Sequence, residues 1–319
     1  MIRPATKSVT GVCPRVLLMV ILSSVTFCAA QELAPRAYLV TPLHSNAITL
    51  SYSFMHGSLN VNGAVPVDNA RGTYGVQILS YYHSFGFFGR SANVLANLPY
   101  AIGNFNGTLT EDQHLHRSGL VDSSYRVSVN LKGGPAMEAR DFVKWKQKVL
   151  LGASLIVVAP TGQYDPTKLV NWGSNRWAFK PEFGYSQRWG HWIFDGAFGG
   201  WFFTTNHDFW SRNSYYSGTR SKTQTPIASL ESHLSYDFRP GCWVSIDGNF
   251  WRGGTATVGG VENSATLQSN SRFGGTGVVR VSKHQLLKIS YNNGAYIRFG
   301  GDYRTVSIGW QYSWLGKPN

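Results

Sequence analysis

The sequence predicts an all-β fold: one transmembrane antiparallel β-barrel of about 12 strands in the bacterial outer membrane. Segments of ten or more residues alternate between apolar and polar side chains, which is the period of an extended strand with two different faces. No uninterrupted apolar stretch after residue 30 is long enough for a membrane-spanning helix. The last segment, 303–315, ends in aromatic residues, as strands do where they meet a membrane interface.

The N-terminus predicts export. Three basic residues precede an apolar run at 16–30 that is too short to cross a bilayer and ends in small residues. We expect a signal peptide at 1–30, cleaved after Ala30, and a single barrel domain at 31–319. Cys28 favours a lipoprotein interpretation, but bulky Phe27 stands where such a site needs a small residue. Cleavage leaves Cys242 as the only cysteine and excludes an intramolecular disulfide.

The strands follow from the alternation, and the first is among the clearest. Ile48, Leu50, Tyr52 and Phe54 fall on one face, and hydroxyl residues fall on the other. An even number of strands returns both termini to the periplasm. We expect strands at 46–56, 74–85, 90–100, 119–132, 148–160, 176–188, 191–204, 226–238, 241–252, 270–282, 285–298 and 303–315.

Connection lengths support this topology, because such barrels have short periplasmic turns and longer outer loops. Short connections are expected near 86–89, 189–190, 239–240 and 283–284, and long ones near 57–73, 101–118, 161–175, 205–225 and 253–269. The connection 133–147 is long for a periplasmic turn and has room for a short helix, and 299–302 is short for an outer loop. A soluble β-sandwich is the competing fold. The strand lengths argue against it, as do the strand-end aromatics Trp192, Trp201, Trp310 and Trp314.

Strand phase assigns the polar face to the lumen, since a charge facing lipid is costly. The chain has 29 Lys and Arg against 16 Asp and Glu, but no basic stripe or module that would bind nucleic acid. We expect no nucleic-acid partner and a polar lumen of mixed sign. The candidate lining residues are Arg126, Lys180, Glu182, Asp195, Glu231, His233, Trp243, Asp247, Asn249, Trp251, Arg272, Arg280 and Lys288.

Two groups of these residues have alternative interpretations. Lys180 and Glu182 beside Asp195 are more typical of a structural ladder of paired charges than of a binding site. Trp243 and Trp251 point inward by phase and could form a stacking face for a ligand. The competing interpretation, which we favour, is an interfacial girdle position or a shift of register.

Catalytic and cofactor motifs are scarce. The chain has no GxSxG, HExxH, paired CxxC or phosphate-binding glycine loop, so we expect no cofactor and no enzymatic activity. The segment EDQHLH offers Glu111, Asp112, His114 and His116 as metal ligands, although a polar outer loop is the simpler interpretation. His83, His191 and His233 are candidates for an outer-membrane hydrolase, which is the alternative function.

The chain end and the outer loops indicate partners. Gly309, Tyr312 and Trp314 are spaced like the C-terminal signal that barrels present to the outer-membrane assembly machinery, although five residues follow it. The outer surface is expected to contact membrane lipid and lipopolysaccharide. The long connection 205–225 places Phe209 and Trp210 among arginines. It would either constrict the pore, which we favour, or contact lipopolysaccharide.

Several segments resemble the outer-membrane family labelled "MetA-pathway of phenol degradation". They are GASLIVVAPTGQYDPTKLVNWGSNRWAFKPEFGYS (152–186), SYDFRPGCWVSIDGNFWRGG (235–254), QSNSRFG (268–274), GGDYRTVSIGWQYSW (300–314) and RSGLVDSSYRVSVNLKGGPAM (117–137). The resemblance covers about residues 35 to 315. It implies a passive outer-membrane channel for small, often aromatic or amphipathic compounds, and it supplies no catalytic or ligand residues. Asn175 and Arg176 are candidates for cargo contact at the mouth, with a scaffold role favoured.

These observations predict a small-molecule permeant and transport by diffusion. There is no nucleotide motif, and no N-terminal extension long enough for a plug domain is expected after the signal. Aromatic acids are the leading permeants and long-chain amphiphiles the second, because aromatics and a basic excess favour flat anionic or neutral compounds. A hydrolase and a structural or adhesive barrel are the alternatives.

Overall fold

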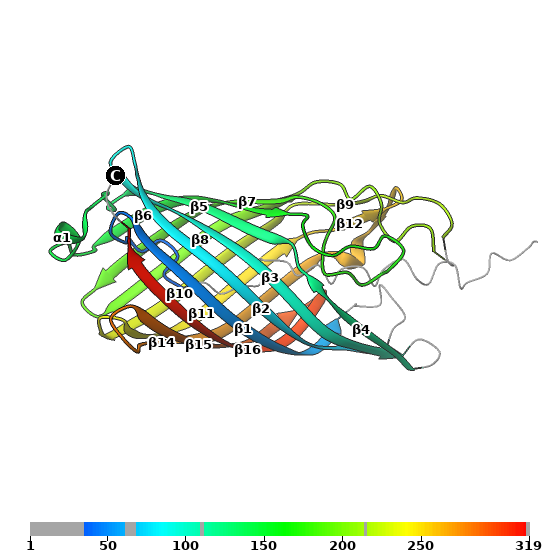
Figure 1. Cartoon of the computed structure of the whole chain (residues 1–319). Helices are drawn as coiled ribbons and strands as arrows, with labels where there is room; N and C mark the ends of the chain where they lie inside the picture. Colours follow the sequence, from blue (N-terminus) through cyan, green and yellow to red (C-terminus); the bar gives the residue numbers. More distant parts are fainter. Residues whose placement is uncertain (1–34, 61–67, 109–111, 214–215, 317–319) are drawn as a thin grey trace, which may run out of the picture.

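The protein is a closed antiparallel β-barrel (Figure 1). A computed structural model describes residues 35–60, 68–108, 112–213 and 216–316. The predicted signal peptide, 1–30, lies outside these residues. The barrel strands are β1 (Ser45–Asn60), β2 (Asp68–Phe87), β3 (Arg90–Thr108), β4 (Asp112–Leu120), β5 (Ser123–Lys132), β6 (Val149–Ala159), β7 (Ala178–Trp189), β8 (Trp192–Phe203), β10 (Ile227–Arg239), β11 (Cys242–Gly253), β14 (Gln268–Arg280), β15 (Gln285–Ile297) and β16 (Gly300–Leu315).

Each strand pairs with its sequence neighbours, and β1 pairs with β16 to close the sheet. The segments β4 and β5 are two parts of one strand, interrupted at Val121 and Asp122, because both pair with β3. The 13 segments therefore make 12 barrel strands. The expected all-β barrel is confirmed, and the soluble β-sandwich is excluded because the sheet has no free edges across the wall.

The expected connections need two corrections. Much of the predicted loops 57–73 and 101–118 is strand, because the hairpins β1–β2 and β3–β4 run on beyond the expected span. Outside the bilayer both faces of a hairpin meet water, so backbone pairing continues without the alternation that marks a spanning strand. The connection 133–147 holds the short helix α1 (Ala139–Phe142). Among the described residues, no helix is long and apolar enough to cross a membrane.

The two ends of the barrel differ. One carries α1, the end of β16 and tight turns, which are closed by left-handed residues such as Phe88, Gly89, Gly190 and Gly241 (Figure 1). The other carries long loops with a three-stranded sheet formed by β9 (Lys222–Gln224), β12 (Ala256–Val258) and β13 (Val261–Asn263). By the rule of short periplasmic turns, the first end is periplasmic and the second extracellular.

The outer face of the barrel is apolar. On β1 and β16 the exposed side chains are the predicted ones, including Leu50, which is 52% exposed, and its cross-strand partner Trp310. Thr305, Ser307 and Gly309 lie on the opposite face of β16. This places Tyr312 on the lipid side and Gly309 on the lumen side of the proposed assembly signal.

A lysine in the centre of the lipid face tests this orientation. Leu50→Lys should lower the free energy of unfolding in lipid vesicles by about 2–4 kcal/mol, because a charge near the bilayer midplane loses its hydration. Leu315→Lys is the matched control: Leu315 is 53% exposed and ends β16, where the cost is about 0–1 kcal/mol. Urea titration followed by tryptophan fluorescence measures both. Equal losses in the two variants would contradict the assigned membrane position.

Candidate functional site: an off-centre cavity in the lumen

One side of the lumen is filled by buried charges. The ammonium of Lys180 lies 2.6 Å from Glu182 and 2.7 Å from Glu231, so it bridges two carboxylates. Arg126 approaches Glu182 at 3.4 Å. On the neighbouring strands, His233 Nδ1 lies 2.9 Å from Asp247, whose second oxygen accepts from Thr276. These side chains come from β5, β7, β10, β11 and β14, and the arrangement is that of a ladder of paired charges.

The N-terminal segment enters this side of the barrel. Arg36 pairs with Asp237 at 2.7 Å, and its guanidinium lies 4.1 Å from the ring centroid of Trp243. Tyr38 donates to Glu182 at 2.8 Å and lies 3.1 Å from the Ser154 hydroxyl. Burial and the Glu182 carboxylate raise the pKa of Tyr38, so its hydroxyl stays protonated as a donor.

Two glycines make the room that Tyr38 occupies. A Cβ on Gly152 would lie 2.2 Å from the Tyr38 ring, and one on Gly184 would lie 2.0 Å from it. The sequence predicted no N-terminal extension long enough for a plug domain. The structure adds that the short described segment 35–44 before β1 places Arg36 and Tyr38 inside the barrel, where the Tyr38 ring lies against strands that carry no side chain at Gly152 and Gly184.

The remainder of the lumen holds a cavity of about 450 Å³, which is lined mainly from β1, β2, β15 and β16 and is completed by end residues of other strands, among them Val158, Trp201 and Phe203. Most inward positions of β1 and β16 are small there, so the wall leaves space where the charged side does not. The hydroxyl residues and the glycine that line it include Thr49, Ser51, Ser53, Ser80, Ser290, Thr305, Ser307 and Gly309. Apolar residues lie among them, including Val76, Ile78, Leu95, Pro99, Trp172, Trp201 and Phe203. The cavity is thus amphipathic.

Charged residues also line the cavity, and most are basic. Arg176, Arg272 and Lys288 are the cations, and Asp122 is the one carboxylate among the lining residues. Asp122 accepts from the backbone of Gly162 at 2.9 Å and from the backbone and hydroxyl of Ser174 at 2.8 and 2.5 Å. Its charge is thereby engaged in holding the loop 160–177 against the strand break between β4 and β5.

The structure divides the predicted lumen residues. Arg126, Lys180, Glu182, Asp195, Glu231, His233, Asp247 and Asn249 lie inside but away from the cavity, whereas Arg272 and Lys288 line it. Trp243 and Trp251 also face inward, yet neither lines the cavity. Trp243 lies under Arg36, and Trp251 is fully buried with its indole donating to Gln268 at 2.8 Å.

Arg280 is a correction to the predicted lining. It is exposed at the last residue of β14, beside the turn glycine Gly241, because the wall ends there. The lumen, predicted to be polar and of mixed sign, also contains an apolar part. Tyr74, Val76, Phe105, Trp172 and Tyr303 form an apolar cluster in the extracellular half.

Two aromatic residues of the cavity escaped prediction. Trp201 was placed in an interfacial belt but is 1% exposed. It shares the strand phase of Asp195, and that phase is the signal that would have placed it inside. Trp172 comes from the connection between β6 and β7, where no strand periodicity exists to orient it.

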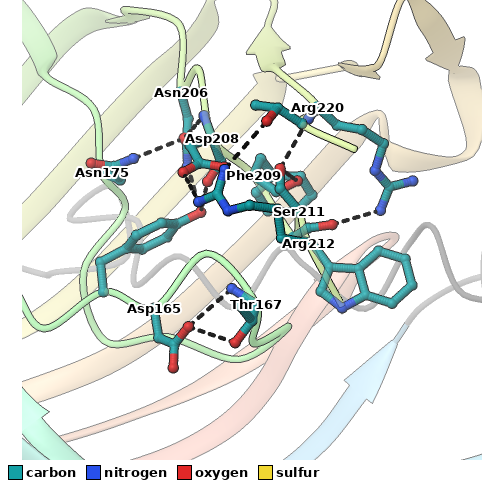
Figure 2. A network of polar contacts seen from close by, with 12 residues as sticks. Asp165, Thr167, Asn175, Asn206, Asp208, Phe209, Ser211, Arg212 and Arg220 are labelled. Carbon is teal, nitrogen blue, oxygen red and sulfur yellow. Dashed lines mark hydrogen bonds and ion pairs between the residues drawn. The ribbon is translucent and has the colours of Figure 1, made fainter. Parts of the chain in front are cut away.

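The long connections form a folded cap at the extracellular end. Phe209 and Trp210 are buried and pack with Leu169 and Val258, so the described part of 205–225 is packed against the neighbouring loops. Figure 2 shows polar contacts of these loops. Asn175 donates to Asn206 of another connection at 3.0 Å, and the backbone N–H of Arg220 donates to the Ser211 hydroxyl within 205–225 at 2.9 Å. A small void between the cap and Arg176 shares that residue with the main cavity.

Lys222 is a buried cation within this cap. It is 3% exposed, and its ammonium lies 4.8 Å from the ring centroid of Phe209. Burial, and secondly the charge of Arg176, lower the pKa of Lys222 to about 7. Protonation of this group therefore opposes closure of the cap at neutral pH.

The candidate metal and hydrolase histidines that the structure describes are engaged in other contacts, while Glu111 and the side chain of Asp112 lie outside the described residues. His114 and His116 share a face of β4, as expected, but each hydrogen-bonds an asparagine of β3, at 2.7 and 2.9 Å. No group of three or more metal-ligating side chains occurs within the described ranges. Both nitrogens of His233 face carboxylates, since Nε2 lies 4.0 Å from Glu231, which is unlike a base oriented toward a serine.

The family follows from a match over most of the chain. The family described as "Putative MetA-pathway of phenol degradation" matches residues 36–314, a range that contains every barrel strand except the last residue of β16. The chain belongs to this family.

Two solved barrel structures are similar in fold to this chain. The COG4313 outer membrane channel from Pseudomonas putida F1 is 18% identical, with a TM-score of 0.74 over 89% of this chain and 100% of that one. The β domain of the Bordetella autotransporter BrkA is 12% identical, with a TM-score of 0.52 over 85% and 100%. No curated protein matches in sequence. These similarities show the outer-membrane barrel fold.

Displacing Tyr38 tests the N-terminal plug. Gly184→Ala should raise single-channel conductance, because the new methyl group occupies the position of the Tyr38 ring. Gly86→Ala is the control, since its Cβ would meet its nearest neighbours at an ordinary 3.5 Å. Planar-bilayer recordings measure both. A Gly184→Ala channel that conducts like the control would show that Tyr38 does not limit the passage.

The cap should tighten as the pH rises. Because the pKa of Lys222 in the closed cap is about 7 against an ordinary 10.5, the opened cap binds more protons between these values, and closure becomes more favourable from pH 7 upward. Hydrogen exchange of residues 206–213, corrected for intrinsic rates, should slow between pH 6.5 and 9.5. Lys222→Met should abolish this dependence, while Lys168→Met, at an exposed cap lysine, should keep it. A dependence that survives Lys222→Met would assign it to another group.

Proposed function

We propose that this protein is a passive outer-membrane channel for small aromatic or amphipathic organic compounds. The observation that carries the proposal is the off-centre cavity, lined by hydroxyl, aliphatic and aromatic side chains inside a closed barrel. A compound with one polar and one apolar part finds partners on the same wall. The family description and the channel of similar fold support this assignment.

The alternatives have less support. A hydrolase needs a nucleophile and a base in contact, whereas both ring nitrogens of His233 face carboxylates, those of Glu231 and Asp247. In a purely structural or adhesive barrel, large side chains that fill the lumen would give higher stability than small ones that leave a cavity, so the cavity favours a channel. The cavity volume lies within the about 300–1,000 Å³ range of small-ligand pockets.

Export and assembly complete the proposal. The residues 1–30 would act as a removable signal peptide. Gly309, Tyr312 and Trp314 would be read by the outer-membrane assembly machinery. The apolar outer face would contact membrane lipid, and the extracellular loops would contact lipopolysaccharide.

Filling the cavity tests the channel. Ser307 lies 2.8 Å from Ser53 across the β1–β16 pair, and both line the cavity. Ser307→Trp should reduce the flux of phenol and similar aromatics into liposomes several-fold, because the indole occupies the passage. Val306→Trp is the control, since Val306 is the adjacent residue on the lipid face, 52% exposed. Absence of flux in the unaltered protein, or equal flux in both variants, would contradict the proposal.

A further inference from the structure

We infer that the cavity binds the carboxylate of small aromatic acids along a row of cations formed by Arg176, Arg272 and Lys288. This inference rests on the proposed channel function and names its substrate class. The three residues come from different elements: the segment before β7, β14 and β15. All three line the same cavity.

Lys288 is an uncompensated charge. Within the described part of the chain it forms neither a hydrogen bond nor an ion pair. Its neighbours along the inward face of β15 are Ser290 and Asn292, and its cross-strand partner on β16 is Gly309. An ammonium among hydroxyls and glycine has room for an incoming anion and no carboxylate to compete with it.

Arg272 is a buried cation with neutral partners. It is 3% exposed, donates to Asn292 at 3.1 Å and to the Gly301 carbonyl at 3.5 Å, and its Nε has no hydrogen-bond partner. Asp302 lies close enough to act on it electrostatically, but the two form no ion pair in the residues described. A buried guanidinium with an unused donor fits a carboxylate.

The cations are spaced along the passage. Arg272 contacts Asn292, which lies four residues beyond Lys288 on the same face of β15, or roughly 13 Å along the strand. Arg176 adds a positive charge next to the cap. A carboxylate that leaves one cation therefore meets polar groups and then the next cation. Among the described lining residues the one carboxylate, Asp122, is hydrogen-bonded to Gly162 and Ser174.

The remaining lining selects what is attached to the carboxylate. Trp172, Trp201 and Phe203 offer aromatic surface in the same cavity, and a fully hydrated inorganic anion would gain nothing from it. The buried cations of the opposite side, Lys180 and Arg126, are neutralised by Glu182 and Glu231 and do not line the cavity. The cavity thus combines cationic side chains with aromatic surface.

Binding of benzoate against benzamide tests the inference without requiring transport. The two probes share the ring and differ in charge. Equilibrium dialysis of the folded protein in a non-ionic detergent should show benzoate binding roughly tenfold more tightly, the difference expected of a charge-assisted contact. Lys288→Met should remove most of this preference. Lys283→Met, at an exposed lysine of the β14–β15 turn, should leave it unchanged.

Arg272→Gln provides a second variant. If Arg272→Gln does not fold, Lys288→Met still decides the test. Equal binding of benzoate and benzamide, or a preference that Lys288→Met leaves intact, would overturn the inference. Bilayer reversal potentials in a sodium benzoate gradient, compared with the flux of neutral phenol into liposomes, separate the two proposals. A channel that passes neutral aromatics with no benzoate preference retains the channel function and loses the carboxylate site. Benzoate binding without any flux retains the carboxylate site and contradicts the channel function.

Discussion

Pairing of the first strand with the last is the constraint on which the rest of the molecule depends. Inside a bilayer no water is present to satisfy an exposed strand edge, so the sheet must close on itself. The β1–β16 ladder runs without interruption from Ser45 and Leu315 to Asn60 and Gly300. Once closed with 12 strands, the wall encloses a lumen too narrow for a wide aqueous pore and too wide to be left empty.

The protein fills that lumen unequally. On the side of β5, β7, β10 and β11, large charged side chains compensate each other and occupy the space between the strands. On the side of β1, β15 and β16, the inward serines, threonines and glycine are small, and the space that they do not fill is the cavity. The choice of side-chain size on alternate residues therefore decides where a passage exists, while the backbone is similar all round.

The two ends then modify this passage by different means. At the periplasmic end, Arg36 and Tyr38 use the charged side as an anchor, because Asp237 and Glu182 offer carboxylates to them. At the extracellular end the loops bury Phe209 and Trp210 in a small core of their own. The N-terminal segment attaches to the charged side and the cap packs on the other loops. The small inward residues of β1 and β16 therefore remain available to a solute.

The sequence by itself determined the wall of this protein. Lipid on one side and a polar lumen on the other impose a period of two, so the strand ranges, the outward face of Leu50 and Trp310 and the inward face of Lys180 and Asp247 could be predicted. Tertiary structure decided what the lumen contains. Tyr38, Trp172 and the cap come from segments without periodicity, and their places depend on gaps at Gly152 and Gly184 or on contacts between distant loops. Phase could say that Lys288 and Lys180 both point inward. Only the folded barrel shows that Lys180 meets two carboxylates whereas Lys288 meets open space, because that difference depends on which strands face each other across the lumen.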